Sequence, residues 1–379
     1  MSNLDDYRAE IDAIDKELIK LFEKRMNVVL NVARYKKENN MEIFQNGREE
    51  EVINKAVNNI VNKDYAKEVK EFITSTMEIS RGLQKRKIEG VKNLDEVEVK
   101  VCDLKVKGKL GFPGVKGAYS EEALLKFFGN DNEIISYKNF EDVFVALDNN
   151  EIEYGIVPIE NSSTGAITDV YDYLRKYDFY IVGEESIKVN QNLIGIKGTK
   201  LEDVKEVYSH PQGISQSSNY LKQFNDWKLI PFVNTATSAK LVKDLGDKSK
   251  VAIASARAAD IYGLDVIEEG INNIADNSTR FVIISMEMKV VPGADKVSVV
   301  LSLEHKAGTL YKLLRYFADN NINMMKIESR PMKETSWRYF IYVDFQGDIN
   351  GEETKKALEQ IEKESAYFKI LGAYKNIIK

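Results

Sequence analysis

The stretch LDDYRAEIDAIDKELIKLFEKRMNVVLNVARYKKEN, residues 4–39, contains neither proline nor glycine and places apolar residues at helical spacing throughout. This pattern predicts one amphipathic helix sustained for about five heptads. At a rise of about 1.5 Å per residue the helix is roughly 54 Å long, which exceeds the diameter of a domain of about 90 residues. The short helices of its own domain cannot cover so long a stripe, so we expect two copies of the chain to pair along it as a homodimer.

The amino-acid composition and the predicted secondary structure change twice along the chain after this helix. No proline precedes Pro113 and glycine is rare before Gly90, so residues 1–90 are predicted to be all-α, with further helices at about 48–61 and 65–87. Residues 91–107 are charged and are predicted to be a linker. Residues 108–288 then alternate β-rich runs, such as 153–159 and 251–254, with amphipathic stretches, as in an α/β domain.

Residues 295–379 are predicted to form an α+β, ferredoxin-like domain. Six segments follow one another there in the order βαββαβ, at 297–304, 310–319, 322–328, 337–344, 351–363 and 368–374. The whole chain is therefore expected to be a multidomain protein in which an all-α domain precedes two domains that contain sheets.

Composition excludes several classes of function. The 379 residues carry 54 Lys+Arg against 60 Asp+Glu, a net charge of −6, so we expect no surface for nucleic acid or anionic lipid. The acidic start and the lack of about 18 consecutive apolar residues argue against a secretory signal and a membrane span. A single cysteine, Cys102, fits a reducing cytoplasm, and two histidines, His210 and His305, cannot build a cysteine–histidine zinc site. We expect chemistry without a metal or an organic cofactor.

Polar side chains interrupt the apolar stripes of the helical block. Arg25 continues a row of apolar residues spaced by seven, and Lys36 falls on nearly the same face. One such side chain could snorkel to water, but two on one stripe favour a buried anion. Ser80 and Gln84 project together from the core face of the third helix, where each could also be a satisfied core polar group.

The second helix opens on Arg48 and Glu49, and Glu49 could simply complement the helix dipole. With the polar positions of the other two helices, the block offers several cations, one carboxylate and two neutral donors, but no nucleophile and no histidine. This inventory suits electrostatic preorganisation and conformational restraint of a dianion, without proton transfer.

The helical block resembles the AroQ-type chorismate mutases, which are intertwined all-helical dimers. The resemblance covers residues 4–88 and is carried by Arg8, Lys24-Arg25, Ala33-Arg34-Tyr35-Lys36, Arg48-Glu49 and Ser80-x-x-x-Gln84. It implies that Arg25 and Arg48 hold the substrate carboxylates and that Lys36 and Gln84 donate to the breaking ether oxygen. It also implies that Glu49 holds the ring hydroxyl, that Ser80 assists binding, and that Arg8 enters the pocket of the partner protomer. Gln45 stands where the family usually has an aspartate.

Three polar signatures follow strand-like runs in the middle block, at 157–165, 208–216 and 277–281. In the first, Asn or Ser could cap a helix, or amides and hydroxyls at the strand end could bind an anion. In the second, a lone histidine before proline is typical of a structural role, so Ser209 and Gln216 are favoured over His210. In the third, the threonine could be a local hydrogen-bonding residue where a loop closes on a strand.

Together with Gly117-Ala118-Tyr119-Ser120 and Thr235-Ala236-Thr237-Ser238, these signatures make residues 109–285 resemble the prephenate dehydratases. The resemblance implies two α/β lobes around a cleft, as in periplasmic binding proteins. It implies that Thr279 donates a hydrogen bond to the leaving hydroxyl and that Arg280 binds a carboxylate. The substrate-binding residues expected on this basis are Glu160, Asn161, Ser162, Ser209, Gln216, Thr235, Thr237, Arg280 and Phe281.

The last block resembles the ACT domains. The resemblance is carried by the loop at 304–310 and by Ile327-Glu328-Ser329-Arg330-Pro331, and it implies feedback inhibition by L-phenylalanine bound between two such domains. The helix that follows the loop offers backbone amides to a carboxylate. The expected effector-binding residues are Ala307, Gly308, Thr309, Leu310, Glu328, Ser329 and Arg330.

The three resemblances occur in the order found in bifunctional chorismate mutase/prephenate dehydratases, which implies conversion of chorismate to prephenate and then to phenylpyruvate. A non-catalytic amino-acid sensor, a dehydratase with a helical dimerisation arm, and an unrelated coiled-coil module are the alternatives. The retained Arg25, Lys36, Arg48 and Gln84 argue against the last two, and the signature at 279–281 argues against the first.

Overall fold

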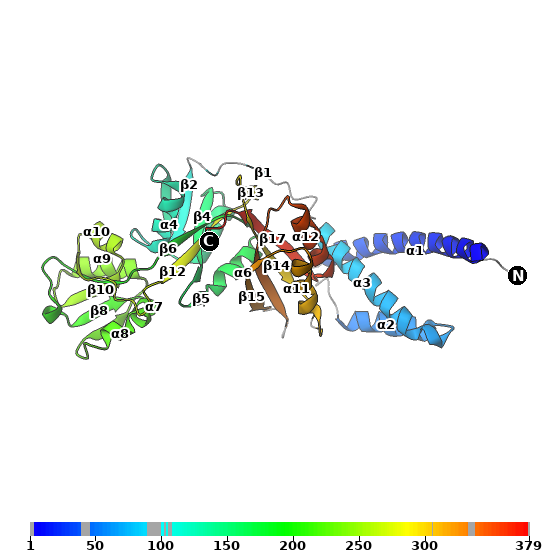
Figure 1. Cartoon of the computed structure of the whole chain (residues 1–379), viewed down its shortest axis with the longest axis horizontal. Helices are drawn as coiled ribbons and strands as arrows, with labels where there is room; N and C mark the ends of the chain where they lie inside the picture. The colour runs from blue at the N-terminus through cyan, green and yellow to red at the C-terminus, as the bar shows by residue number, and fades with distance from the viewer. Residues whose placement is uncertain are drawn as a thin grey trace. The chain divides into compact units, whose positions relative to one another are not determined.

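The helices and strands fall into two compact units, residues 1–97 and 98–379, each of which is described by itself. The computed structural model describes residues 4–38, 46–88, 100–101, 104, 108–304, 306–332 and 338–377 (Figure 1). Among these residues, no helix combines the length and the apolar character needed to cross a membrane.

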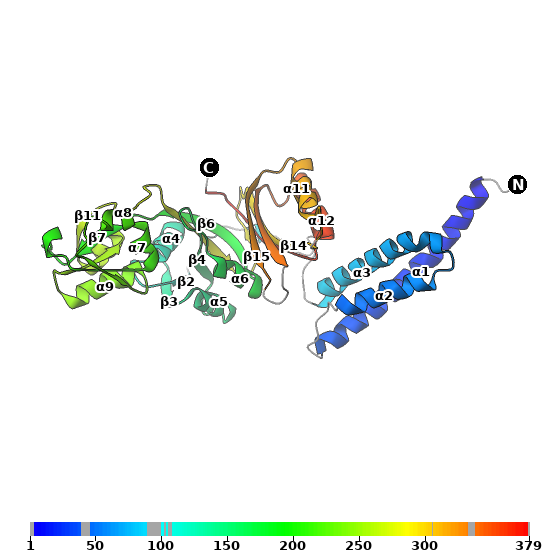
Figure 2. The same ribbon diagram turned by 90° about the horizontal axis from the view of Figure 1, so that it is seen from below.

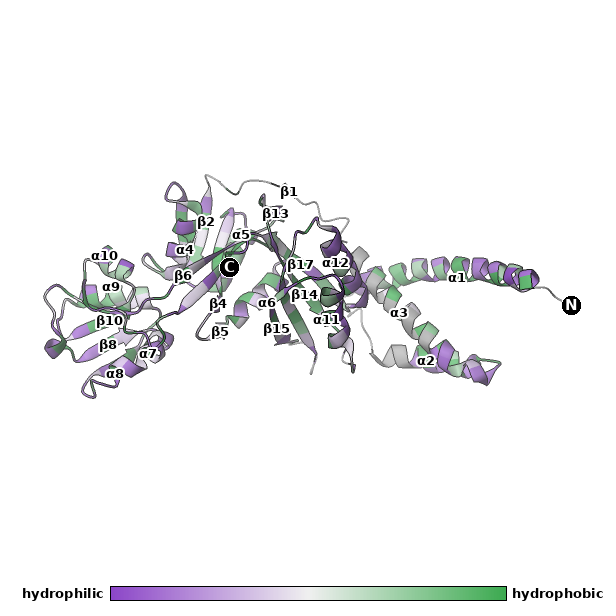
Figure 3. Ribbon diagram, viewed as in Figure 1, coloured by the Kyte–Doolittle hydropathy of each residue, from purple (hydrophilic) through white to green (hydrophobic). Residues whose placement is uncertain are grey.

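The first unit consists of three helices. The long helix α1 (Leu4–Glu38) is followed by α2 (Asn46–Asn59) and α3 (Ala66–Ile88), close to the bounds that periodicity predicts. Helix α3 packs against both others, and Met77 of α3 is buried, as are Met26 and Ala33 of α1. Residues 4–24 of α1 are exposed throughout, because α1 extends beyond α2 and α3 (Figure 2). This exposed part repeatedly carries hydrophobic residues (Figure 3).

The second unit contains two α/β lobes, as expected. The first lobe has the sheet order β3-β2-β4-β12-β6 with a short β5 beside β4. Its strands are β2 (Lys109–Pro113), β3 (Glu133–Tyr137), β4 (Tyr154–Asn161), β5 (Gly165–Ala166), β6 (Tyr180–Lys188) and β12 (Ser278–Ser285). Its helices are α4 (Tyr119–Phe128), α5 (Phe140–Asp148) and α6 (Thr168–Lys176). The buried strands β4 and β12 lie at its centre and pair antiparallel.

The second lobe is inserted between β6 and β12, so the chain crosses between the lobes twice. Its sheet order is β11-β7-β10-β8-β9. The strands are β7 (Asn192–Gly195), β8 (Glu206–Ser209), β9 (Lys228–Pro231), β10 (Lys250–Ala254) and β11 (Asp265–Glu268). The helices are α7 (Pro211–Gln216), α8 (Ser218–Leu221), α9 (Thr235–Leu245) and α10 (Ala256–Tyr262).

The predicted βαββαβ order is confirmed at the end of the chain. It comprises β14 (Lys296–Ser302), α11 (Thr309–Asp319), β15 (Met324–Pro331), β16 (Tyr339–Gln346), α12 (Glu352–Glu364) and β17 (Tyr367–Tyr374). The antiparallel sheet has the order β15-β16-β14-β17. Strand β17 packs directly on β6 of the first lobe, where a Cβ on Gly372 would clash with the backbone oxygen of Ile181.

One sequence-based prediction needs correction, and the structure excludes one of the two alternatives that were open for the signature at 157–165. Part of the predicted linker belongs to the second unit, because β1 (Lys100–Val101) pairs in parallel with β13 (Lys289–Val290) and Leu104 is buried against Leu110. The polar signature after β4 does not cap a helix: β4 turns into β5, and α6 begins two residues later without a side-chain cap.

Candidate active sites

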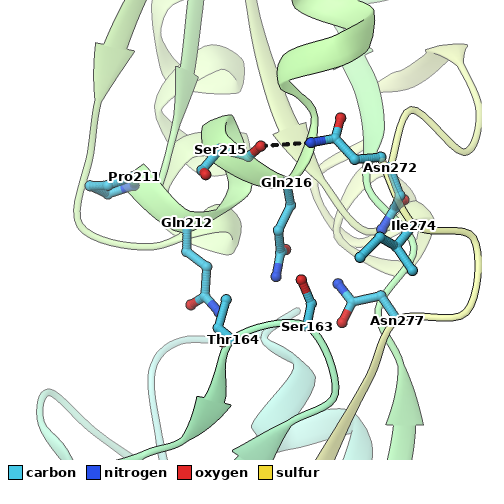
Figure 4. A pocket seen from close by; sticks show the side chains of 10 residues that line it. Ser163, Thr164, Pro211, Gln212, Ser215, Gln216, Asn272, Ile274 and Asn277 are labelled. Atoms are coloured by element: carbon cyan, nitrogen blue, oxygen red, sulfur yellow. Dashed lines mark hydrogen bonds between the residues drawn. The ribbon is translucent and has the colours of Figure 1, made fainter.

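A pocket of about 500 Å³ lies between the two α/β lobes. Three segments line it: the turn between β4 and β5, helix α7, and the connection from β11 back to β12 (Figure 4). The lining residues are Ser163, Thr164, Pro211, Gln212, Ser215, Gln216, Asn272, Asn273, Ile274 and Asn277. None of these side chains carries a formal charge, so the pocket offers amides and hydroxyls to a ligand.

Asn161, at the end of β4, connects Thr279 to this pocket. Its Nδ2 donates to Thr279 Oγ1 at 3.0 Å and to Oδ1 of the lining residue Asn277 at 2.8 Å. Its Oδ1 accepts from the backbone N–H groups of Ser163 and Thr164 at 3.0 and 3.1 Å. Only 3% of Asn161 is exposed, so the amide is held firmly in this network. Because the amide occupies the Thr279 oxygen as a donor, it orients the hydroxyl hydrogen to donate elsewhere.

The second lobe contributes two glutamines that meet the first lobe or the crossover segments. Gln212 Nε2 donates to Thr164 Oγ1 at 2.8 Å and so joins the two lobes across the pocket. Gln216 Oε1 accepts from Gln191 Nε2 at 3.3 Å, and Gln191 Oε1 is buried without a hydrogen-bond partner. Figure 4 shows the side chains of Gln216, Ser163 and Asn277 converging. The structure places Gln216, which was expected to bind substrate, at the pocket wall.

Sequence reasoning missed Asn277, Gln212 and Gln191 as individual site residues. The first two lie inside the signatures at 277–281 and 208–216, so the signal was present, but nothing in those signatures ranks an amide above its neighbours. Gln191 lies outside every quoted motif and takes its place only through the crossover between the lobes. There its backbone N–H donates to Asn272 Oδ1 at 2.7 Å.

Other predicted residues support the backbone and do not line the pocket. Ser209 is fully buried and donates to Ile253 O at 2.9 Å. Ser162 Oγ accepts from the backbone N–H of Ser278 at 2.9 Å and ties the ends of β4 and β12 together. Thr237 forms a capping box with Asn234 at the start of α9, and Thr235 is the first residue of that helix.

His210 has the structural role that its sequence context suggests. Its Nδ1 accepts from the backbone N–H of Gln212 at 3.2 Å and caps α7. Burial lowers the pKa of His210, which favours the neutral ring that this acceptor role requires.

Arg280 and Glu160 do not join Thr279 in the pocket, contrary to the prediction. Arg280 is 5% exposed, and its guanidinium contacts three protein carboxylates, Glu160 and Glu184 at 3.0 Å and Asp344 at 3.1 Å. Successive strand residues point to opposite faces, so Arg280 turns away from the side that Thr279 faces. Along β4 the side chains alternate in the same way: Glu160 lies opposite Arg280 and shares its face, and Asn161 lies opposite Thr279 and shares the other face.

Phe281, which was also expected to bind substrate, does not line the pocket. Its ring is 2% exposed and packs in the core of the first lobe with Leu110, Phe112 and Tyr154. A ring enclosed in that way has no face left for a ligand.

The first unit brings Arg25, Ser80 and Gln84 together where α1 packs on α3. Arg25 Nη1 donates to Ser80 Oγ and, at 3.4 Å, to Thr76 O, while Gln84 Nε2 donates to Val29 O at 3.3 Å. Burial lowers the pKa of Arg25, and no carboxylate pairs with it within residues 4–38 and 46–88 as far as they are described. A partly desolvated guanidinium whose partners here are neutral oxygens favours an anionic ligand.

Of the remaining predicted residues of this unit, the structure describes the side chains of Lys36 and Arg8. Lys36 is half-buried near the end of α1. Arg8 is exposed and pairs with Asp5 at 3.3 Å, and at about 1.5 Å per residue it lies about 25 Å from Arg25 along the same helix. The side chains of Arg48 and Glu49, and Gln45, lie outside the described residues.

The predicted effector residues occupy two places in the last domain. Ala307, Gly308, Thr309 and Leu310 form the loop that follows β14 and the start of α11, where the first two and Leu310 are exposed. Glu328, Ser329 and Arg330 lie on β15, and β16 separates β15 from β14 in the sheet. Burial alternates along β15, so Glu328 and Arg330 face the first lobe while Ser329 faces solvent.

Family models match the three parts of the chain in order. The chorismate mutase type II model matches residues 7–85, the prephenate dehydratase model residues 110–289, and the ACT domain model residues 297–363.

Similar proteins agree with this order. The bifunctional chorismate mutase/prephenate dehydratase of Buchnera aphidicola is 30% identical over 97% of this chain and 95% of its own length. The prephenate dehydratase of Arthrobacter aurescens, solved in complex with L-Phe, is 28% identical and has a TM-score of 0.65 over 71% of this chain and 90% of that chain. A protein described as a quorum-quenching acylase is 26% identical, also with a TM-score of 0.65, over 71% of this chain and 98% of that chain. The acylase matches no more of this chain than the dehydratase does, whereas the Buchnera protein matches nearly all of it. The chain therefore belongs to the bifunctional chorismate mutase/prephenate dehydratases that carry an ACT domain.

Proposed function

We propose that the pocket between the lobes is the dehydratase site and that Thr279 donates a hydrogen bond to the hydroxyl that leaves prephenate. The hydrogen bond from Asn161 Nδ2 to Thr279 Oγ1 carries this proposal, because it orients the hydroxyl beside pocket-lining Asn277. Loss of the ring carboxylate as carbon dioxide supplies the electron pair that expels the hydroxyl. A leaving hydroxyl needs a proton or a strong hydrogen bond, and threonine supplies the latter. The uncharged lining leaves the departing carboxylate without a counter-ion that would favour its retention.

Replacing the Thr279 hydroxyl by a methyl group tests this assignment. We expect Thr279→Val to lower dehydratase kcat by about 10²–10⁴-fold, since one positioned proton or hydrogen-bond donor contributes that much. Asn161 keeps its other acceptors, Asn277 Oδ1 and Ser278 O, so the variant should fold normally. Thr279→Ser keeps the hydroxyl and is the matched control, and chorismate consumption by the same chain checks the amount of folded protein. Full turnover of prephenate by Thr279→Val would rule the assignment out.

For the mutase, we propose that Arg25, Ser80 and Gln84 form one wall of the site, with Lys36, Arg48 and Glu49 completing it. Arg8 would enter from a partner subunit, because it lies about 25 Å from Arg25 along its own helix. The exposed apolar residues within 4–24 support pairing of two α1 helices in a homodimer. The cytoplasmic location expected from the single cysteine remains a prediction.

For regulation, we propose that L-phenylalanine binds between the ACT domains of two subunits. The dehydratase of Arthrobacter aurescens, which resembles the second unit, was solved in complex with L-Phe. In one copy of this chain the loop after β14 and the motif on β15 are separated by β16. The loop after β14 in one copy can therefore meet the β15 motif of a second copy more readily than the β15 motif of its own copy.

A further inference from the structure

Six charged residues form an ionic cluster between the first α/β lobe and the ACT domain. The lobe supplies Glu160, Glu184 and Arg280, and the ACT domain supplies Lys296, Lys326 and Asp344. Three cations thus meet three anions. The side chains of Glu184, Lys296 and Arg280 are 0%, 2% and 6% exposed, so water screens these pairs weakly.

The contacts cross the boundary between the two domains at several points. Lys326 Nζ lies 2.9 Å from Glu160 Oε1, and Lys296 Nζ lies 2.8 Å from Glu184 Oε2. Asp344 Oδ2 lies 3.1 Å from Arg280 Nη1 and 3.7 Å from Lys296 Nζ. Each ACT residue comes from a different strand, β14, β15 or β16, so the cluster contacts three of the four strands of the ACT sheet.

A cluster of this kind could serve adhesion alone, but its position in the chain gives it a more specific consequence. Arg280 directly follows Thr279 on β12, and Glu160 directly precedes Asn161 on β4. The strands pair Arg280 with Glu160 and Thr279 with Asn161. The register of β12 against β4 shifts by one residue at the next step, between Arg280 and Phe281, and the pairing continues on both sides of the shift. On its other side β12 stays paired with β6 through Thr279 and Arg280, so the ionic contacts act on Thr279 and Asn161 together with the backbone hydrogen bonds of the sheet.

The cluster also reaches the strand on which effector binding is proposed. Lys326 lies two residues before Glu328 on β15, on the same face, and Arg330 of that face contacts Asp172 of α6 at 3.4 Å. A movement of β15 must therefore displace Lys326 from Glu160 or move Glu160 with it.

We propose that Lys326 and Asp344 are positioning residues of the dehydratase site, which set the Thr279–Asn161 pair through Arg280 and Glu160 and pass a shift of β15 on to it. This inference rests on the proposed roles of Thr279 and Asn161. It assigns an effect on the chemical step to two ACT residues that lie neither in the pocket nor among the proposed effector-binding residues.

Lys326→Met in the full-length chain is the principal test, because Lys326 lies at the rim of the cluster with 14% of its side chain exposed. We expect dehydratase kcat to fall about tenfold with KM for prephenate within about twofold, as for loss of an interaction made in the transition state. The phenylalanine concentration for half-inhibition should rise about tenfold, and mutase activity should not change. Lys326→Arg should restore the wild-type values. Asp344→Asn should act in the same direction.

Asp178→Asn is the matched control. Asp178 contacts Lys369 of β17 at 2.8 Å across the same pair of domains, but it is 79% exposed and touches no member of the cluster. Its φ of 56° suits asparagine, so the substitution removes only the charge. We expect wild-type kcat, KM and half-inhibition.

The outcomes separate this inference from the assignment of the site. If Thr279→Val is inactive while Lys326→Met and Asp344→Asn keep wild-type kcat and wild-type inhibition, the positioning role is wrong and the dehydratase site stands. If Thr279→Val is active, the site itself is wrong. A loss in Lys326→Met that appears only as less folded protein, or that Lys326→Arg does not restore, would also overturn the positioning role.

Discussion

Adjacent residues of one motif serve opposite faces of the same strand. The sequence analysis placed Thr279 as the donor and Arg280 and Phe281 as substrate-binding residues of one site, but the strand directs Thr279 to the side of Asn161 and Arg280 to the ACT domain. The period of two was visible in the sequence and could have separated the two side chains. Which of the two faces carries the pocket could not be predicted, because Asp344 and Lys326 arrive from a later domain.

Phe281 provides a test at the scale of one side chain. Because its ring is buried in the core, we expect Phe281→Ala to lower the free energy of unfolding of the second unit by about 3–5 kcal/mol, through lost apolar burial and the cavity it leaves. KM for prephenate should change little in the protein that remains folded. Urea unfolding and steady-state kinetics measure the two quantities.

The control for that substitution is Phe281→Leu, which keeps most of the volume and should cost less than about 1.5 kcal/mol. A raised KM in Phe281→Leu with unchanged stability would instead return Phe281 to the substrate site.

Long, strongly periodic elements were predictable, and very short ones were not. Helix α1 ends within one residue of its predicted end, and the six elements of the ACT domain appear in the predicted order. The two-residue strands β1 and β5 were missed, because two residues leave no alternation to detect. They exist only through pairing with β13 and β4, which is information from elsewhere in the chain.

A substitution on the exposed part of helix α1 tests whether two copies of the chain pair there. Ile11 is 56% exposed on the part of α1 that its own domain leaves uncovered. We expect Ile11→Glu to separate paired α1 helices, because each partner would have to bury a charge. Mutase kcat/KM should fall about 100-fold or more, since Arg8 would no longer reach a partner's pocket, while dehydratase activity remains.

Chorismate and prephenate consumption by the same preparation measure the two activities, and ultracentrifugation measures the size of the particle. Ala13→Glu adds the same charge to α1 beside its apolar stripe. This control should leave the two activities and the particle size unchanged. Wild-type mutase activity in Ile11→Glu would contradict both the pairing of α1 and the role of Arg8.

Over the whole molecule, the order of the domains could be predicted, but the contact between the last two could not. Each domain carries its own periodicity and motifs, so composition and pattern separate them. The ionic cluster is different. Its Glu160 and Arg280 were expected to bind substrate, and its other four members look like ordinary surface charges when each is taken alone. Only docking of the ACT sheet on β4, β6 and β12 makes Glu184 and Lys296 buried partners. The cluster thus becomes visible only in the folded second unit.

Docking of these charges also makes the stability of the second unit depend on pH. Burial alone would raise the pKa of Asp344, but Arg280 and Lys296 outweigh burial and hold that pKa below its ordinary value. A carboxyl with a lower pKa in the folded chain stabilises the fold above its unfolded pKa of about 3.9 and loses this contribution as pH falls through the folded value. We therefore expect the free energy of unfolding, measured by urea titration of the full chain, to decrease between about pH 5 and pH 2. Asp344→Asn should show a smaller decrease over this range, although it is less stable at neutral pH because Arg280 and Lys296 keep their charges. An equal decrease in both proteins would mean that Asp344 is not held as an anion by this cluster.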